Sequence, residues 1–124
     1  MADCVIVENH ADTREAAAEY LSHCGFEVRT ADGGAALWRL IDERVPDVIV
    51  MDLKLPSVDG WELTRQIRAD RRTRDVPIAV LSASVGKDDR DRALACGANV
   101  FLSKPCDPDQ IAATLSGLVA QATR

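Results

Sequence analysis

Val48-Ile49-Val50-Met51-Asp52 joins a continuous apolar run to an acid, and the turn-rich residues 53–60 follow it. A run that is apolar at every position indicates a strand buried on both faces, as in a parallel sheet. An acid that ends such a strand lies in the crevice beyond the carboxyl ends of the strands, where open α/β sheets bind their ligands. Asp52 is therefore the first candidate for a functional residue.

Short apolar runs alternate with helical patterns on both sides of this stretch. The expected strands are Cys4 to Val7, Phe26 to Thr30, Asp47 to Asp52, Ile78 to Leu81 and Asn99 to Leu102. The expected helices start at the capping residues Asp12 and Asp32, at Gly60, at Lys87 and at Asp107 with Pro108. The first is stopped by Gly25, the third ends near Ala69, and the fourth ends at Cys96 before Gly97. Five βα units predict a parallel sheet with helices on both faces and right-handed crossovers.

The composition describes an ordinary globular chain. With 124 residues, 47% hydrophobic and 28% charged, one domain with a real core is expected. A net charge of −5 argues against a nucleic-acid binder. Because neither an export signal nor a long apolar span is apparent, a cytoplasmic protein without a membrane segment is expected. The cysteines, which form no C-x-x-C pair, are then interpreted as reduced thiols in preference to disulfides or a zinc site: Cys4, Cys24, Cys96 and Cys106.

Polar groups also end three other predicted strands. Glu8 with Asn9 follows the first strand, Ser82 ends the fourth, and Lys104 follows the fifth. Together with Asp52 they would meet at one rim of the sheet. Carboxylate, amide, hydroxyl and ammonium groups are what a carboxylate needs to carry a phosphoryl group beside a divalent cation.

These motifs resemble the receiver domain of two-component response regulators, the fold of the bacterial chemotaxis response regulator. The likeness covers essentially the whole chain, and its motifs are Val5-Ile6-Val7-Glu8-Asn9, Asp52-Leu53-Lys54-Leu55-Pro56 through Asp59-Gly60, Ser82-Ala83, Phe101 and Lys104-Pro105. Five matches in order at the family's spacing make a specific signal. The resemblance implies a flavodoxin-like, doubly wound (βα)5 fold in which the parallel strands follow the order 2-1-3-4-5.

The resemblance also assigns roles to individual residues. Asp52 is expected to take a phosphoryl group from the phosphohistidine of a sensor histidine kinase or phosphotransfer protein, and Lys104 and Mg²⁺ are expected to neutralise charge. Ser82 would bind a phosphoryl oxygen and allow Phe101 to switch position, although Phe101 is also explained as an ordinary core residue. The bond between Lys104 and Pro105 is expected to be cis. The chain would catalyse at most its own phosphorylation and dephosphorylation, and it is not expected to be an enzyme.

The metal site is where the sequence departs from the family. The implied ligands of Mg²⁺ are Asn9, the Asp52 carboxylate and the Lys54 backbone carbonyl, with Glu8 acting through water. Because Asn9 replaces an acid, weaker Mg²⁺ binding than usual is expected. The alternative is that Glu8 and Asn9 form only a polar turn.

Other residues receive weaker interpretations. Lys54 and Ser84 lie two positions beyond Asp52 and Ser82, where the family tunes phosphoryl lifetime, or they are plain exposed loop residues. A basic cluster is interpreted as a solvated helix end: Arg65, Arg68, Arg71, Arg72 and Arg74. The isolated histidines, His10 and His23, are interpreted as surface residues, and Trp38 and Trp61 as packing residues.

The most economical hypothesis is a phosphoacceptor receiver that signals through a protein-binding surface. The resemblance places that surface on the fourth helix, fifth strand and fifth helix, with a downstream protein as partner. The alternative, motivated by Asn9, is a receiver-like module that binds proteins with weak or no phosphorylation. Two enzyme-like classes fit less well: a haloacid-dehalogenase-type phosphatase needs an acid where Lys54 stands, and an FMN protein needs a hydroxyl-rich loop in place of residues 8–12.

Overall fold

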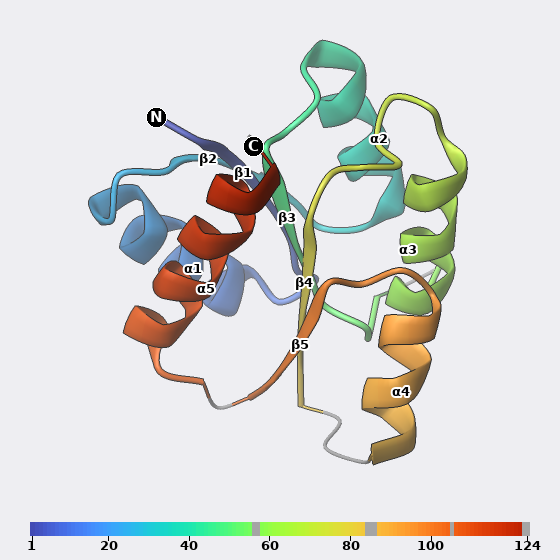
Figure 1. Ribbon diagram of the computed structural model, residues 1–124. Coiled ribbons are helices and arrows are strands. Elements are labelled where there is room, and N and C mark those ends of the chain that lie inside the picture. The colour runs from blue at the N-terminus through green and yellow to red at the C-terminus, as the bar shows by residue number, and fades with distance from the viewer. Residues whose placement is uncertain (56–57, 84–86, 105, 123–124) are drawn as a thin grey trace.

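Five strands alternate with five helices in the computed structural model, which describes residues 1–55, 58–83, 87–104 and 106–122 (Figure 1). The strands are β1 (Asp3–Val7), β2 (Glu27–Ala31), β3 (Val48–Met51), β4 (Ile78–Ser82) and β5 (Val100–Ser103). The helices are α1 (Ala11–His23), α2 (Gly34–Glu43), α3 (Gly60–Ala69), α4 (Lys87–Ala95) and α5 (Pro108–Ala122). Each expected element is present, so the predicted βα alternation is confirmed.

All strand pairs are parallel, and the sheet has the order β2-β1-β3-β4-β5. The register sets Val7 of β1 beside Ala31 of β2 and Met51 of β3, and Ser82 of β4 beside Ser103 of β5. The predicted flavodoxin-like order is therefore confirmed. Because the strands are parallel, the residues that follow β1, β3, β4 and β5 all leave the sheet at one edge.

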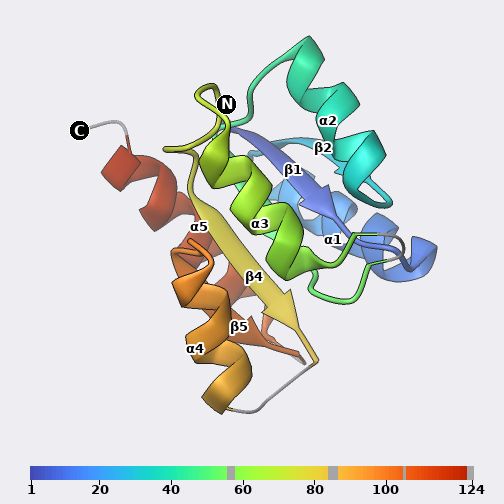
Figure 2. The same cartoon turned by 90° about the vertical axis from the view of Figure 1, so that its right-hand side faces the viewer.

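Alternate residues of the central strands feed two separate cores. Val5 and Val7 pack with α2, α3 and α4, whereas Cys4 and Ile6 pack with α1 and α5. Figure 1 shows α1 and α5 on one face of the sheet, and Figure 2 shows α2, α3 and α4 covering the other. Every residue of β1 and β3 is buried, as the continuous apolar runs predict for a parallel sheet.

The two expected aspartate caps are wrong by one or two residues. The carbonyl of His10 accepts the first helical hydrogen bond, from the Arg14 N–H, so α1 starts at Ala11 and Asp12 lies inside its first turn. The Gly33 carbonyl accepts from the Leu37 N–H, so Gly33 takes the place expected for Asp32. Asp12 still suits its position, because an acid in the first turn interacts favourably with the helix dipole.

Strand and helix bounds shift by a residue for local reasons. The Phe26 N–H donates to the carbonyl of Leu21 at the end of α1, so β2 starts one residue later than expected. Asp47 and Asp52 flank β3 without belonging to it, Cys96 follows α4, and β5 runs one residue further along the chain. The glycine stops are present: Gly25 and Gly97 have φ of 98° and 116°, a backbone region that favours glycine.

The basic cluster is only partly a solvated helix end. The Arg68 guanidinium donates to the carbonyls of Val76 and Gly97, at 2.6 and 2.9 Å, and to Asn99 Oδ1 at 2.9 Å. These bonds hold α3 against the segments that precede β4 and β5. Arg72 pairs with Asp42 and Asp70, so the cluster does not form a free basic patch.

The thiols and helix lengths complete the fold. All four cysteines are free, with Cys4 and Cys96 buried and Cys24 exposed. Among the described residues, none of the helices has the length and apolar character needed to cross a bilayer.

Candidate phosphoryl-acceptor site

Three charged side chains follow β1, β3 and β5 and meet at the carboxyl edge of the sheet. Glu8 continues β1 through its N–H bond to Ala31, and Asp52 continues β3 through its N–H bond to Val7. The Lys104 N–H donates to the carbonyl of Ser82 at 2.8 Å. Backbone bonds of the sheet therefore fix where each side chain starts, which is why strand ends are precise platforms for a site.

Lys104 connects the two acids. Its Nζ lies 2.7 Å from Glu8 Oε1 and 3.6 Å from Asp52 Oδ2. Glu8 and Asp52 are 4% and 6% exposed, so both carboxylates are largely removed from bulk water. One ammonium group thus faces two nearly buried carboxylates, and the trio carries a net negative charge when all three groups are ionised.

The loop behind Asp52 is held by backbone contacts. The Lys54 N–H donates to Asp52 Oδ1 at 3.2 Å, and the Gly60 N–H donates to the Leu53 carbonyl at 2.9 Å. A Cβ on Gly60 would lie 2.4 Å from the Asp52 carbonyl oxygen, so only glycine fits at this position. Asp59 caps α3 by accepting from the Glu62 N–H, which fixes the end of the loop.

The two carboxyl groups have pKa values shifted in opposite directions. Burial alone would raise the pKa of Glu8, but hydrogen bonds with Asp52, Lys104 and the His10 N–H lower it to about 2. Burial, and then the hydrogen bond to Glu8, raise the pKa of Asp52 above its ordinary value. Glu8 is therefore the acid that ionises more readily, and the ionised form of Asp52 is the one that an added positive charge stabilises most.

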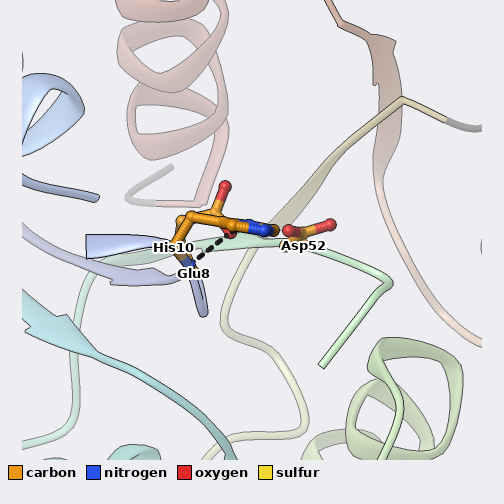
Figure 3. A group of neighbouring side chains, drawn as sticks. All are labelled: Glu8, His10 and Asp52. Atoms are coloured by element: carbon orange, nitrogen blue, oxygen red, sulfur yellow. Dashed lines mark hydrogen bonds and ion pairs between the residues drawn. The ribbon is translucent and has the colours of Figure 1, made fainter. Parts of the chain in front are cut away.

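His10 joins this group, which the sequence interpretation missed. Its Nδ1 lies 3.5 Å from Glu8 Oε2, and donor atoms of Glu8, His10 and Asp52 all lie within 4.8 Å of one another (Figure 3). The expectation that His10 is exposed is correct, but the expectation that it is isolated is wrong. The chain bends at Asn9 and the backbone of His10 is extended, and this path brings the imidazole beside Glu8. Residue type carries no signal for the path of this loop, so the sequence interpretation could not find the contact.

The remaining candidate residues are placed less completely. Ser82 is fully buried at the end of β4, and Phe101 of β5 is 6% exposed beneath the Arg90 guanidinium, which lies 5.8 Å from the ring centroid. Asn9 and the Lys54 side chain are exposed. Ser84 and Pro105 lie outside the described residues, so the lifetime role of Ser84 and the cis bond stay predictions.

An apolar cavity of about 740 Å³ adjoins the charged group. Its lining includes Glu8, Asp52 and Lys104, together with Tyr20 of α1 and Ile111 of α5. The Asp52 carboxylate is thus largely buried and yet borders a space that a reactant could enter. A second cavity of about 350 Å³ lies beside α2 and is lined in part by Asn9, Asp32 and Gln66 of α3.

The donor set fits a divalent cation. Two largely buried carboxylates share one ammonium group, and the surplus negative charge favours a bound dication. Glu8 and Asp52 are the residues that could hold it among the acids described, with His10 as the neighbouring nitrogen donor.

Comparison with known proteins finds a family and relatives that match most of the chain. Residues 4–116 match the sequence model of the family described as response regulator receiver domain. The transcriptional regulatory protein GltR of Pseudomonas aeruginosa is 34% identical over 118 residues, which are 95% of this chain and 49% of that protein. The chain spans about half the length of this protein and of two other curated relatives that it matches.

Solved structures show the same fold. The receiver domain of a signal transduction histidine kinase from Syntrophus aciditrophicus superposes with a TM-score of 0.92 at 27% identity, covering 100% of this chain and 94% of that one. A chemotaxis response regulator of Vibrio cholerae gives a TM-score of 0.88 at 26% identity, covering 95% and 98% of the two chains.

Proposed function

Because the chain belongs to the response regulator receiver domain family, we propose that it accepts a phosphoryl group on Asp52 from the phosphohistidine of a sensor kinase or phosphotransfer protein. The observation that carries this proposal is the position of Lys104 Nζ, 3.6 Å from Asp52 Oδ2 at the border of a cavity. A nucleophilic carboxylate with a cation beside it, next to open space, is suited to phosphoryl transfer.

In the proposed reaction an Asp52 Oδ forms a bond to phosphorus while the bond from phosphorus to the donor imidazole breaks. The donor nitrogen leaves with the electron pair and is protonated by water. Lys104 is placed to pair with a phosphoryl oxygen, and Ser82 is proposed to donate a hydrogen bond to another. Phosphoryl transfer depends mainly on positioning and charge stabilisation, so these groups supply what the protein must contribute.

The proposed cofactor is Mg²⁺, which would offset the charge of the carboxylates and the phosphoryl oxygens. Glu8, Asn9, Asp52 and the Lys54 carbonyl are proposed to hold it, Glu8 through water. Glu8 is already committed to Lys104 at 2.7 Å, which is consistent with an indirect role. With asparagine at position 9, the site has one negative charge fewer than two acids would give, so weaker Mg²⁺ binding is proposed.

Signal output is proposed to pass from Ser82 to Phe101 and on to a protein partner. Phe101 lies in β5 and is covered by Arg90 of α4, so a movement of the ring would change its contact with α4. The proposed docking surface for the downstream protein is α4, β5 and α5, without direct nucleic-acid contact by this chain. Lys54 and Ser84 are proposed to tune the lifetime of the phosphoryl group, and the location is proposed to be cytoplasmic, where the kinase partner would phosphorylate it.

The test is incubation with acetyl phosphate, with and without Mg²⁺, followed by intact mass measurement. We expect a Mg²⁺-dependent gain of one phosphoryl group that is absent from Asp52→Asn. The Asn9 side chain motivates the second candidate, a module that binds partners without phosphorylation. A cognate kinase that binds the chain but transfers no phosphoryl group would favour that second function.

A further inference from the structure

The imidazole of His10 lies beside the carboxylates of Glu8 and Asp52. Its Nδ1 lies 3.5 Å from Glu8 Oε2, and Figure 3 shows its ring directed toward Asp52. Donor atoms of the three side chains lie within 4.8 Å of one another, so a cation held by Asp52 and His10 would have Glu8 beside it, close enough to act through water. The His10 side chain is 73% exposed, so its imidazole is accessible to an ion from solvent.

The loop that carries His10 is anchored. The His10 N–H donates to Glu8 Oε2 at 3.3 Å, and Arg14 Nη1 donates to the carbonyls of Glu8 and Asn9 at 3.0 and 3.3 Å. Two of the three donors, Glu8 and Asp52, are more than nine-tenths buried. The site therefore consists of two pre-positioned carboxylates and one imidazole on a restrained backbone, which is more specific than a patch of surface acids.

The chemistry of these donors separates one class of ion from another. Mg²⁺ prefers oxygen ligands in octahedral geometry, whereas imidazole nitrogen suits transition-metal dications. Asn9 removes a negative charge that would favour Mg²⁺, while His10 adds a neutral nitrogen that favours transition metals. Both residues shift selectivity in the same direction.

We propose that His10 is a direct ligand and that this site prefers first-row transition-metal dications over Mg²⁺. Affinity should rise from Mn²⁺ through Co²⁺ as nitrogen ligation becomes more favourable. The inference rests on the proposed function in that it concerns the metal site of the same Asp52, and it assigns His10 a role that the receiver reading leaves open.

Calorimetric titration of the untagged, chelator-treated, reduced protein with Co²⁺ and with Mg²⁺ tests the inference. In His10→Ala we expect Co²⁺ affinity to fall by about tenfold or more, with Mg²⁺ affinity nearly unchanged. His23→Ala is the matched control, because His23 lies exposed in the last turn of α1 and should leave both affinities unchanged. His10→Asp, which restores an oxygen donor, should shift the preference back toward Mg²⁺.

A second readout reports the ligand itself. Proton NMR of the Co²⁺ form should show a strongly shifted exchangeable imidazole resonance in the wild type and in His23→Ala, and none in His10→Ala. Equal loss of Co²⁺ and Mg²⁺ affinity in His10→Ala, or no loss of either, would overturn the inference. If that happens while Asp52 still gains a phosphoryl group with Mg²⁺, only the role of His10 fails; if His10-dependent binding is found without any phosphorylation, the proposed function fails and the metal site stands.

Discussion

Lys104 Nζ lies 2.7 Å from Glu8 Oε1, although the two residues are 96 positions apart in the sequence. The contact joins the ends of β1 and β5, which are separated by β3 and β4 in the sheet. Asp52, at the end of β3, lies between them, and its Oδ2 is farther from the Lys104 Nζ, at 3.6 Å. The first two predictions concern the balance of charge among these three residues.

Lys104→Met should destabilise the metal-free protein. Removing the ammonium group leaves two nearly buried carboxylates without their shared partner, which is expected to cost about 1–3 kcal/mol of unfolding free energy. Urea unfolding in EDTA measures this cost, and added Mg²⁺ should recover part of it by supplying positive charge. Phosphorylation by acetyl phosphate should slow by about 100-fold, because one charge-stabilising donor is lost.

Lys54→Met is the matched control for this change, because the Lys54 side chain is exposed. Its unfolding free energy should stay within about 0.5 kcal/mol of the wild-type value. Equal losses in both variants would show that Lys104 does not balance the acids.

Asp52→Asn should stabilise the metal-free protein at neutral pH. The Asp52 carboxylate is largely buried and lies beside Glu8, and both features disfavour its charge. A neutral amide of the same shape should therefore raise the unfolding free energy by about 1 kcal/mol, or the midpoint temperature by a few degrees. Thermal unfolding in EDTA measures the gain, which should shrink when Mg²⁺ stabilises the wild type.

Asp47→Asn makes the same chemical change at a residue that is expected to respond in the opposite way. Asp47 is exposed, and its Oδ2 accepts from the Asp3 N–H at 2.7 Å, so the amide should lose about 0.5 kcal/mol. A loss of stability in Asp52→Asn as well would contradict the repulsion that we infer.

Gly60→Ala should disturb the loop that holds Asp52. The new Cβ would lie 2.4 Å from the Asp52 carbonyl oxygen and 2.6 Å from the Leu53 Cα, so the backbone must shift. We expect a loss of about 2 kcal/mol or more in denaturant unfolding, together with slower phosphorylation. Gly117→Ala is the control: nothing lies within 4 Å of its added Cβ in α5, and the same methyl should stabilise that helix by about 0.5–1 kcal/mol.

The Cys4 thiol should make stability depend on alkaline pH. Burial, and then the charge of Asp3, raise the pKa of Cys4 to about 12, against an ordinary value of 9.0. Because the folded state disfavours the thiolate, stability should fall as the pH rises above about 9, by up to about 1.4 kcal/mol per pH unit. Urea unfolding under reducing conditions at pH 8 and pH 10 should show a smaller decrease for Cys4→Ala than for the wild type. Equal decreases would contradict a buried, protonated thiol.

The fold was readable from the sequence because its signals are local. Continuous apolar runs marked strands buried on both faces, and glycines at positive φ marked the ends of α1 and α4. Helix starts were less readable, because Asp12 and Asp32 are good caps by residue type, yet the carbonyls of His10 and Gly33 accept the first helical bonds. Which carbonyl does so depends on the path of the loop from the preceding strand.

The site was readable in part for the same reason. Glu8, Asp52 and Lys104 follow strands, and parallel strands bring their ends together at one edge. His10 was missed because its place beside Glu8 depends on the bend of the chain at Asn9 after β1, which residue type does not reveal. Arg68 was missed because its partners include the carbonyls of Val76 and Gly97, and carbonyls leave no trace in a sequence pattern.

The most direct test of the central claim is to locate the acyl phosphate. After reaction with acetyl phosphate and Mg²⁺, borohydride reduces an aspartyl phosphate to homoserine, and tryptic cleavage releases residues 45–54, which contain both Asp47 and Asp52. We predict homoserine at position 52 and unchanged aspartate at position 47. Unmodified Asp52 in protein that has gained a phosphoryl group, or a product at Glu8 or His10, would contradict the account.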